Sequence, residues 1–182
     1  MDEVFLDLDK YGLGHLKGNQ YPSEEELEKL IAAFLAESLS PKISGLELSK
    51  DSFNALLELS HCRRCGKCCL PSKIHPDNPG IFVDTPDLEL LSRKTSHNLK
   101  ALRKLAKINY NPKYTVGARY LPQPCIFFDK ERRGCKVYPY RPFVCGLFPV
   151  LYDSDNDLIV DLSCEYGKDI YRNWIKALKT NK

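Results

Sequence analysis

Four cysteines fall within eight consecutive positions of the segment HCRRCGKCCLPSKIHP, which spans residues 61–76. They are Cys62, Cys65, Cys68 and Cys69. A C-x2-C spacing lets two thiolates from one tight turn reach the same metal, and Gly66 permits the close backbone approach that such a turn needs. Thiols this close together, between Arg, Gly and Lys residues, do not have the spacing of core positions. The run therefore predicts a metal site.

Four further cysteines lie far from this run, at Cys125, Cys135, Cys145 and Cys164. Cys62, Cys65 and Cys68 have the spacing of the first three ligands in a bacterial ferredoxin run. The fourth ferredoxin cysteine is missing, because position 72 is Ser. A fourth ligand must therefore come from Cys69 or from the distant group. Because adjacent side chains diverge, we expect Cys68 and Cys69 to serve two centres, or one to ligate while the other packs or reacts.

All eight cysteines are thus candidate metal ligands, and the spacing favours a 4Fe-4S cluster over zinc. Thiols that the cluster does not use could bind a second metal, such as zinc. The alternatives are buried, unconnected thiols and disulfides. His61 and His75 flank the first run and could replace a thiolate, but eight cysteines already suffice for two four-thiolate sites.

Cations accompany both groups of cysteines: Arg63, Arg64, Lys67, Arg132, Arg133, Lys136 and Arg141. A cation beside a thiolate lowers its pKa and favours the deprotonated ligand. Simple surface solvation is the alternative explanation for these charges.

The pattern of cysteines resembles the YkgJ-type family, which is described as a "putative zinc- or iron-chelating domain". The family pattern is C-x2-C-G-x-C-C, then a cysteine beside an apolar pair, then C-x-I-Y-x2-R-P-x2-C-R-x-F, and a last cysteine before a helix. The matching residues are Cys62, Cys65, Gly66, Cys68, Cys69, Cys125, Cys135, Tyr138, Arg141, Pro142, Cys145, Phe148 and Cys164. The resemblance covers about residues 61–170, and it departs from the pattern at Val137 and Gly146.

The resemblance implies metal binding and leaves the activity open. The same domain type occurs in a flagellin lysine N-methylase, for which an iron–sulfur cluster is implied. A structural or electron-transfer module acting with a protein partner, a zinc-binding structural protein, a protein-modifying enzyme and a metal carrier are therefore all hypotheses, and a shared domain does not transfer a reaction.

Helical patterns precede and follow the first cysteine run. Ser23 and Glu26 form a capping box before an amphipathic helix that ends ahead of Pro41. A second helix is predicted at residues 49–60. Beyond the run, we expect one helix with Thr85 as its N-cap and Pro86 at its first position, and another opening at Ser96.

The C-terminal part is predicted to be loop, hairpin and helix. Prolines between Pro122 and Pro149 interrupt every regular pattern. Residues 148–162 predict a β-hairpin that turns at residues 154–157, and residues 167–179 predict a helix. The predicted fold is mostly α, an α+β fold with one small β-hairpin, in which long cysteine-bearing loops converge on a metal centre.

Charge divides the chain in two. Residues 1–60 carry 12 Asp/Glu against 5 Lys/Arg, whereas residues 61–182 carry 12 against 22 and hold every cysteine. We therefore expect an acidic helical region at 1–60, as a partly separate layer, and a cysteine-cluster domain at 61–182. The N-terminal sequence lacks the pattern of a secretory signal, and no apolar run is long enough to cross a bilayer. These features predict a cytoplasmic protein without membrane contact.

A basic stripe is predicted on one helix, at Lys100, Arg103, Lys104 and Lys107. The residues stand at i, i+3, i+4 and i+7, and no acidic residue occurs between Arg93 and Lys113. Such a stripe could bind nucleic acid or an acidic protein. Because aromatic residues are not interleaved with it, the sequence favours a solvated face or a contact with the acidic N-terminal region.

Overall fold

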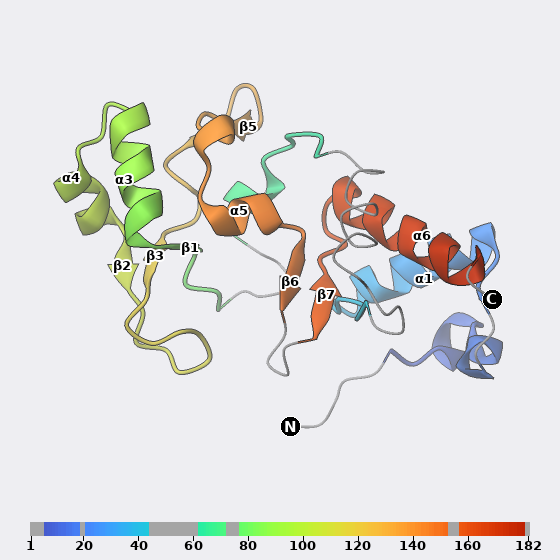
Figure 1. Ribbon diagram of the computed structural model, residues 1–182. Helices are drawn as coiled ribbons and strands as arrows, with labels where there is room; N and C mark the ends of the chain where they lie inside the picture. The colour runs from blue at the N-terminus through green and yellow to red at the C-terminus, as the bar shows by residue number, and fades with distance from the viewer. Residues whose placement is uncertain (1–5, 19–20, 44–61, 72–76, 153–156, 181–182) are drawn as a thin grey trace. The chain divides into compact units, whose positions relative to one another are not determined.

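The computed structural model describes residues 6–18, 21–43, 62–71, 77–152 and 157–180 (Figure 1). Within these residues, helices combine with three small antiparallel sheets, so the fold is α+β. By its packing the chain forms two compact units, a first unit of residues 1–63 and 149–182 and a second unit of residues 64–148. Each unit has its own apolar core.

The first unit begins with two 3-10 helices, η1 (Asp9–Tyr11) and η2 (Gly14–Gly18), followed by α1 (Glu24–Ala36). The predicted capping box is confirmed, because the Ser23 side chain accepts from the Glu26 amide at 3.3 Å and Glu26 accepts from the Ser23 amide at 2.8 Å. These bonds satisfy two amides that the first helical turn leaves without an intrahelical partner.

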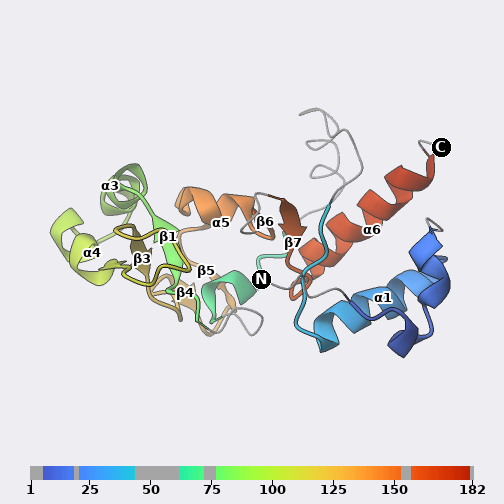
Figure 2. The ribbon, with the colours of Figure 1, turned by 90° about the horizontal axis from the view of Figure 1, so that it is seen from below.

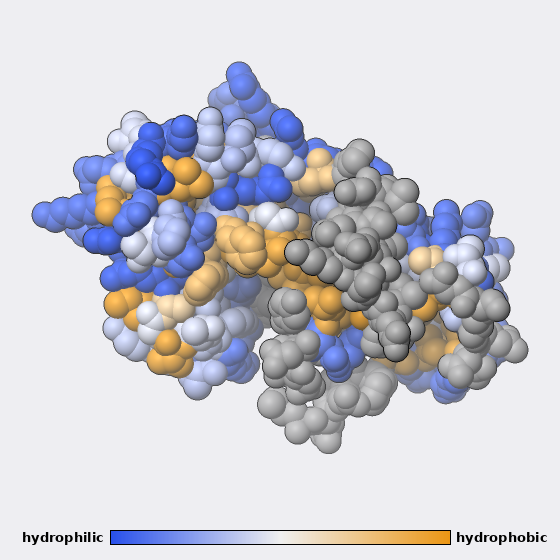
Figure 3. All heavy atoms as spheres, viewed as in Figure 1, coloured by the Kyte–Doolittle hydropathy of each residue, from blue (hydrophilic) through white to orange (hydrophobic). Residues whose placement is uncertain are grey.

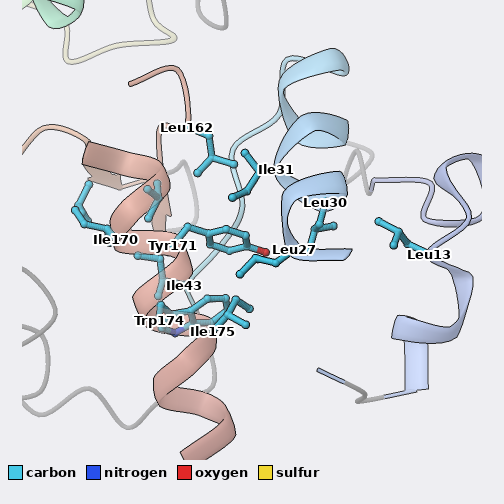
Figure 4. Close-up of a cluster of buried hydrophobic side chains, with 12 residues drawn as sticks. Leu13, Leu27, Leu30, Ile31, Ile43, Leu162, Ile170, Tyr171, Trp174 and Ile175 are labelled. Carbon is cyan, nitrogen blue, oxygen red and sulfur yellow. The ribbon is translucent and has the colours of Figure 1, made fainter. Parts of the chain in front are cut away.

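The remainder of the first unit is the predicted hairpin and terminal helix, and both are confirmed. Strands β6 (Val150–Tyr152) and β7 (Leu158–Val160) pair antiparallel with Leu151 opposite Ile159, and α6 (Glu165–Thr180) follows. Figures 1 and 2 show α6 beside α1, and Figure 4 shows side chains of the two helices directed toward one another. Arg172 of α6 donates to both carboxylate oxygens of Glu28 on α1, at 2.7 and 2.9 Å.

The second unit opens with a sheet and two helices that the sequence predicted only in part. Its elements are β1 (Ile81–Val83), α3 (Thr85–Lys94), α4 (Leu99–Leu105), β2 (Lys107–Ile108) and β3 (Arg119–Leu121). The strands form an antiparallel sheet in the order β1-β3-β2. The prediction named one hairpin, and this sheet was missed because its strands are only two or three residues long, too short for an alternating pattern to register.

Both predicted N-caps in this unit are wrong by one or two residues. Asp84 caps α3 in place of Thr85, since its carboxylate accepts from the Asp87 amide at 2.8 Å and Asp87 completes a capping box. Asn98 caps α4 in place of Ser96, accepting from the Ala101 amide at 2.8 Å. In each case a stronger side-chain acceptor stands three residues before the amide that needs a partner.

The cysteine-bearing stretch between Pro122 and Pro149 is mostly irregular, as predicted, but holds three short elements besides its loops. They are a hairpin of β4 (Phe128–Asp129) and β5 (Gly134–Cys135), the 3-10 helix η4 (Tyr138–Tyr140) and the helix α5 (Phe143–Leu147). The first cysteine run contributes another 3-10 helix, η3 (Lys67–Cys69).

The domain boundary expected at residue 60 stays a prediction. In the packing, residues 149–182 group with the N-terminal part, because α6 and the hairpin share an apolar core with α1. The helix predicted at 49–60 lies outside the described residues. Within the described part of the chain, no helix is both long and apolar enough to span a membrane.

Candidate metal centre

Five cysteine side chains come together in the second unit. Cys69 lies at their centre, 3% exposed, and its thiol is within hydrogen-bonding range of the sulfur atoms of Cys68, Cys125 and Cys135. Cys145 lies near enough to three of these sulfurs to interact with them electrostatically. We call Cys68, Cys69, Cys125, Cys135 and Cys145 the thiol group. Two segments more than 50 residues apart in sequence thus supply it.

The turn around Gly66 sets the position of the first two thiols. Gly66 has φ +72°, in the left-handed region, and precedes η3. Its carbonyl accepts from the Cys69 amide at 2.9 Å. The second segment is tied to this turn by the Cys125 amide, which donates to the Cys69 carbonyl at 2.8 Å, and by the Gln123 side chain, which donates to the Cys68 carbonyl at 2.9 Å.

The β4–β5 hairpin and α5 position the other two thiols. The Phe128 amide donates to the Cys125 carbonyl at 2.9 Å, and Phe128 stands opposite Cys135 in the hairpin. Cys145 belongs to α5, whose first turn is closed by a 3.0 Å bond from the Cys145 amide to the Pro142 carbonyl. Backbone hydrogen bonds therefore tie the Cys125 segment to the first cysteine run and to the β4–β5 hairpin, and the bond at Cys145 closes the turn of its own helix.

Hydrogen bonds among the thiols separate their acidities. Hydrogen bonds with the sulfur atoms of Cys125, Cys135 and Cys68 raise the pKa of the Cys69 thiol. Cys69 therefore keeps its proton and acts as the hydrogen-bond donor. The bond from Cys69 lowers the pKa of Cys68 and Cys125, and lowers that of Cys135 to about 6. Burial raises the pKa of Cys145. Three thiols of the group are thus shifted toward the thiolate, the form in which cysteine binds metals, whereas Cys69 and Cys145 are shifted toward the protonated form.

Two arginines near the thiol group, Arg64 and Arg141, place their guanidinium groups over the ring of Tyr138. The guanidinium carbon of Arg64 lies 4.4 Å from the ring centroid, and that of Arg141 lies 4.1 Å from it. Arg141 also acts electrostatically on Cys68, Cys135 and Cys145, in each case lowering the thiol pKa as a secondary cause. This positive charge offsets the negative charge that several thiolates around a metal would carry.

Three of the eight candidate cysteines lie outside the thiol group. Cys62 and Cys65 are exposed, the first in the first unit and the second beside Gly66. Cys164 is buried in the first unit, where its sulfur accepts from the Gly167 amide at 3.4 Å. His61 and His75 lie outside the described residues.

The expected divergence of Cys68 and Cys69 is wrong. Their sulfur atoms lie within hydrogen-bonding range of each other. The reason is that both belong to a 3-10 turn, in which successive side chains are about 120° apart, and not to an extended segment that would send them to opposite sides. One centre can therefore use both.

Comparison with known protein families identifies the kind of domain that carries these cysteines. A model of the CxxCxxCC family, described as a "putative zinc- or iron-chelating domain", matches residues 61–165. This match covers more than half of the chain and includes all eight cysteines. The chain belongs to the CxxCxxCC family. The resemblance noted in the sequence is thereby confirmed, since the YkgJ-type family is this domain.

A relative of the CxxCxxCC chain occurs in Methanocaldococcus jannaschii, as an uncharacterized protein. It is 29% identical over 92 residues, which cover 49% of this chain and 43% of the relative. The chain thus spans less than half the length of that relative. No solved structure matches the chain significantly.

The thiol group fits the donor set of a zinc- or iron-chelating domain, because both zinc and iron–sulfur clusters accept four thiolates. Within the described residues, no three His, Cys, Asp or Glu side chains stand ready-arranged to hold a metal ion. Four of the five sulfurs, those of Cys68, Cys69, Cys125 and Cys135, are instead joined by thiol hydrogen bonds, and Cys145 interacts with the group electrostatically. Binding a metal would therefore release the Cys69 proton and turn these side chains toward a common centre.

Sequence reasoning named Phe127 among the aromatic residues around the thiols but missed Gln123 and His97. Gln123 lacks any spacing signal, and its role follows only from the fold. The His97 ring packs edge-to-face on the ring of Phe127, with the ring centroids 5.5 Å apart. Phe127 comes two residues after Cys125 in the sequence. Its Nδ1 atom is buried without a hydrogen-bond partner among the described residues. These contacts join segments that are distant in sequence, so local patterns could not reveal them.

The substitution Gly66→Ala should destabilise the second unit by roughly 1–3 kcal/mol. An added Cβ would lie 2.4 Å from the Phe128 ring and 3.1 Å from the Arg133 carbonyl oxygen, at a φ of +72°. Denaturant unfolding would measure the change. Gly117→Ala is the control, since its φ is also positive but nothing lies within 4 Å of the added atom. Equal losses in both variants would show that the packing against Phe128 contributes nothing.

Proposed function

We propose that this protein binds metal in a cysteine-ligated centre built from the thiol group, and that a 4Fe-4S cluster is the metal species. The observation that supports the proposal most directly is the position of the Cys69 thiol, within hydrogen-bonding range of three other cysteine sulfurs in a buried setting. A set of five thiols contains the four that a cubane or a zinc ion requires.

Two features favour iron–sulfur over zinc. Cys62, Cys65 and Cys68 have ferredoxin spacing, and this feature requires the exposed Cys62 and Cys65 to turn toward the thiol group when a cluster binds. The aromatic and aliphatic side chains around the thiols, among them Phe127, Phe128 and Val137, belong to the apolar cluster that encloses them. Such a shell limits solvent access and tunes the potential of a cluster. Zinc, bound by four of the thiols in a closed structural site, is the alternative.

The residues around the centre have distinct roles in this proposal. Cys68, Cys69, Cys125, Cys135 and Cys145 supply the candidate ligands, while the exposed Cys62 and Cys65 and the buried Cys164 remain further candidates. Arg141 favours the thiolate forms. A bound cluster would supply one-electron chemistry or simply cross-link the loops.

A protein partner is part of the proposal. Phe143 and Leu147 flank Cys145 on α5, and their side chains are exposed. Exposed apolar side chains beside a redox centre fit a docking partner in electron transfer. A protein-modifying enzyme or a metal carrier would use the same centre differently, since an enzyme needs an open coordination position and a carrier needs exchangeable ligands.

The deciding measurement is the iron, acid-labile sulfide and zinc content of protein purified without oxygen, together with its visible spectrum. A 4Fe-4S centre predicts about four irons and four sulfides per chain and a broad absorption near 400 nm. About one zinc per chain without colour would overturn the cluster and leave a structural zinc site. Neither metal in stoichiometric amount would overturn the metal centre itself.

A further inference from the structure

A continuous part of the second unit carries cations and no carboxylates. Residues 90–128 contain eight Lys/Arg and no Asp or Glu. This part includes α4, β2 and the loop that leads to β3. In Figure 3 the surface over α4 is hydrophilic, and hydrophobic patches appear below it, where Figure 1 places the β2–β3 loop. An excess of positive charge attracts polyanions. The carboxylate of Asp77 offsets one of these charges, since it pairs with Lys113 of the loop at 2.8 Å.

Four of these cations are exposed in a row, at Lys100, Arg103, Lys104 and Lys107. None of the four forms an ion pair with any residue in the described ranges. The predicted helical stripe is corrected in one respect, because α4 ends at Leu105 and Lys107 lies on β2. Three of the four cations therefore belong to the helix and the fourth to the strand that follows it.

The next residues form a loop whose shape is fixed from inside by Asn109. This side chain is 7% exposed, donates to the Asn111 carbonyl at 2.9 Å and the Thr115 carbonyl at 3.3 Å, and accepts from the Asn111 amide at 3.0 Å. The Asn109 amide donates to the Ala118 carbonyl at 2.9 Å. A loop closed by its own buried amide presents its outer side chains in defined positions.

The outer side chains of this loop include an exposed aromatic ring. Tyr110 is 78% exposed, and Val116 is 59% exposed on the far side of the loop. Tyr110 comes three residues after Lys107. An exposed aromatic ring thus follows the four cations in the chain, although the helix itself has no aromatic residue. A surface that binds single-stranded nucleic acid has two parts. Cations follow the phosphate backbone, and an aromatic ring stacks on a base.

We propose that the row Lys100–Lys107 and Tyr110 form a binding surface for single-stranded nucleic acid. The lysines and Arg103 neutralise phosphates, and Tyr110 stacks on a base. A single strand fits better than a duplex, because α4, the helix that carries three of the cations, has only seven residues, which is short for a helix that reads a groove. A lipid surface fits less well, since the exposed apolar side chains that follow the cations in sequence, Ile108, Tyr110 and Val116, lie on β2 and its loop and form no apolar face of α4.

Fluorescence anisotropy of a labelled 15-nucleotide single-stranded RNA, titrated with metal-loaded protein at several salt concentrations, tests the proposal. Separate arms use a single-stranded DNA of equal length, the corresponding duplex, and vesicles containing phosphatidylserine. We expect both single strands to bind at low salt more tightly than the duplex does, with an affinity that falls as salt rises.

The triple variant Lys100→Gln, Lys104→Gln, Lys107→Gln should bind at least about tenfold more weakly, and its salt slope should be smaller by about 2. The matched control removes three exposed lysines elsewhere, as Lys29→Gln, Lys130→Gln, Lys176→Gln. Both triple variants lose the same net charge. Weaker RNA binding in the first variant alone would therefore support a localised binding surface.

Tyr110 is tested separately from charge. Tyr110→Ala should weaken binding about fivefold or more, whereas Tyr110→Phe, which keeps the ring, should bind like the parent. Absence of single-strand binding at low salt, equal losses in the two triple variants, or binding to vesicles alone would each overturn the proposal. Metal content plays no part in these outcomes, so they are independent of the proposed centre.

Discussion

Replacing Cys69 by alanine should weaken metal binding by more than about 100-fold and lower the metal retained after purification. Cys69 is the thiol that contacts three other sulfurs, so its loss removes the donor at the middle of the set. Structural metal sites in small domains are worth about 10–16 kcal/mol in apparent free energy, so one of four ligands accounts for roughly 3 kcal/mol or more, over 100-fold in affinity. Metal per chain, measured on anaerobically purified variants, is the direct readout.

The control for this variant is Val137→Ala, which removes buried volume from the same apolar cluster without removing a sulfur. It should lower the free energy of unfolding by about 1–3 kcal/mol and keep its metal. Cys135→Ala and Cys145→Ala complete the series. If Cys69→Ala retained full metal content while folding normally, Cys69 would be a packing residue, and the ligands would have to come from the other cysteines.

The sequence predicts that the two cysteine groups converge, but it does not tell which of the cysteines lie together in the site. A donor set needs four thiols, so the ferredoxin-like run had to recruit Cys69 or a distant cysteine. Which distant cysteines reach Cys69 depends on a hairpin with two-residue strands and on single backbone bonds, such as that between Cys125 and Cys69. Elements this short leave no periodic signal.

The relation of Cys68 to Cys69 shows how local backbone geometry decides a site. An extended chain would direct the two side chains apart. Gly66 in the left-handed conformation instead starts a 3-10 turn, and both sulfurs stay within reach of one another. Sequence identified Gly66 as a turn residue, and the structure adds that the Phe128 ring and the Arg133 carbonyl of the second segment leave no room for a side chain at this position.

The helices were predictable where their signals are local. Ser23 and Glu26 lie three residues apart and satisfy each other's amides without help from the rest of the chain, so the start of α1 follows from sequence. The start of α3 was misplaced by one residue because Asp84, Thr85 and Pro86 all favour a helix N-terminus. Asp87 decides the outcome, since it also accepts from the Phe143 amide at 3.0 Å, a contact 56 residues away in sequence.

Removing the metal with a chelator should unfold the cysteine-bearing loops of the second unit and leave the first unit folded. The two units have separate apolar cores, and the thiol group belongs to the core of the second. Trp174 is the only tryptophan of the chain and is buried in the core of the first unit. Its fluorescence therefore reports on the first unit alone.

Amide hydrogen exchange gives the matching readout for the second unit. After chelation, amides in residues 62–71 and 122–148 should lose at least about tenfold in protection, because the metal is the strongest cross-link between those two segments. Amides of α3 and α4 should change less, since Leu88, Leu91 and Leu102 are almost fully buried in aliphatic packing. A simultaneous shift in Trp174 fluorescence would contradict this prediction, because it would show that removing the metal also changes the first unit.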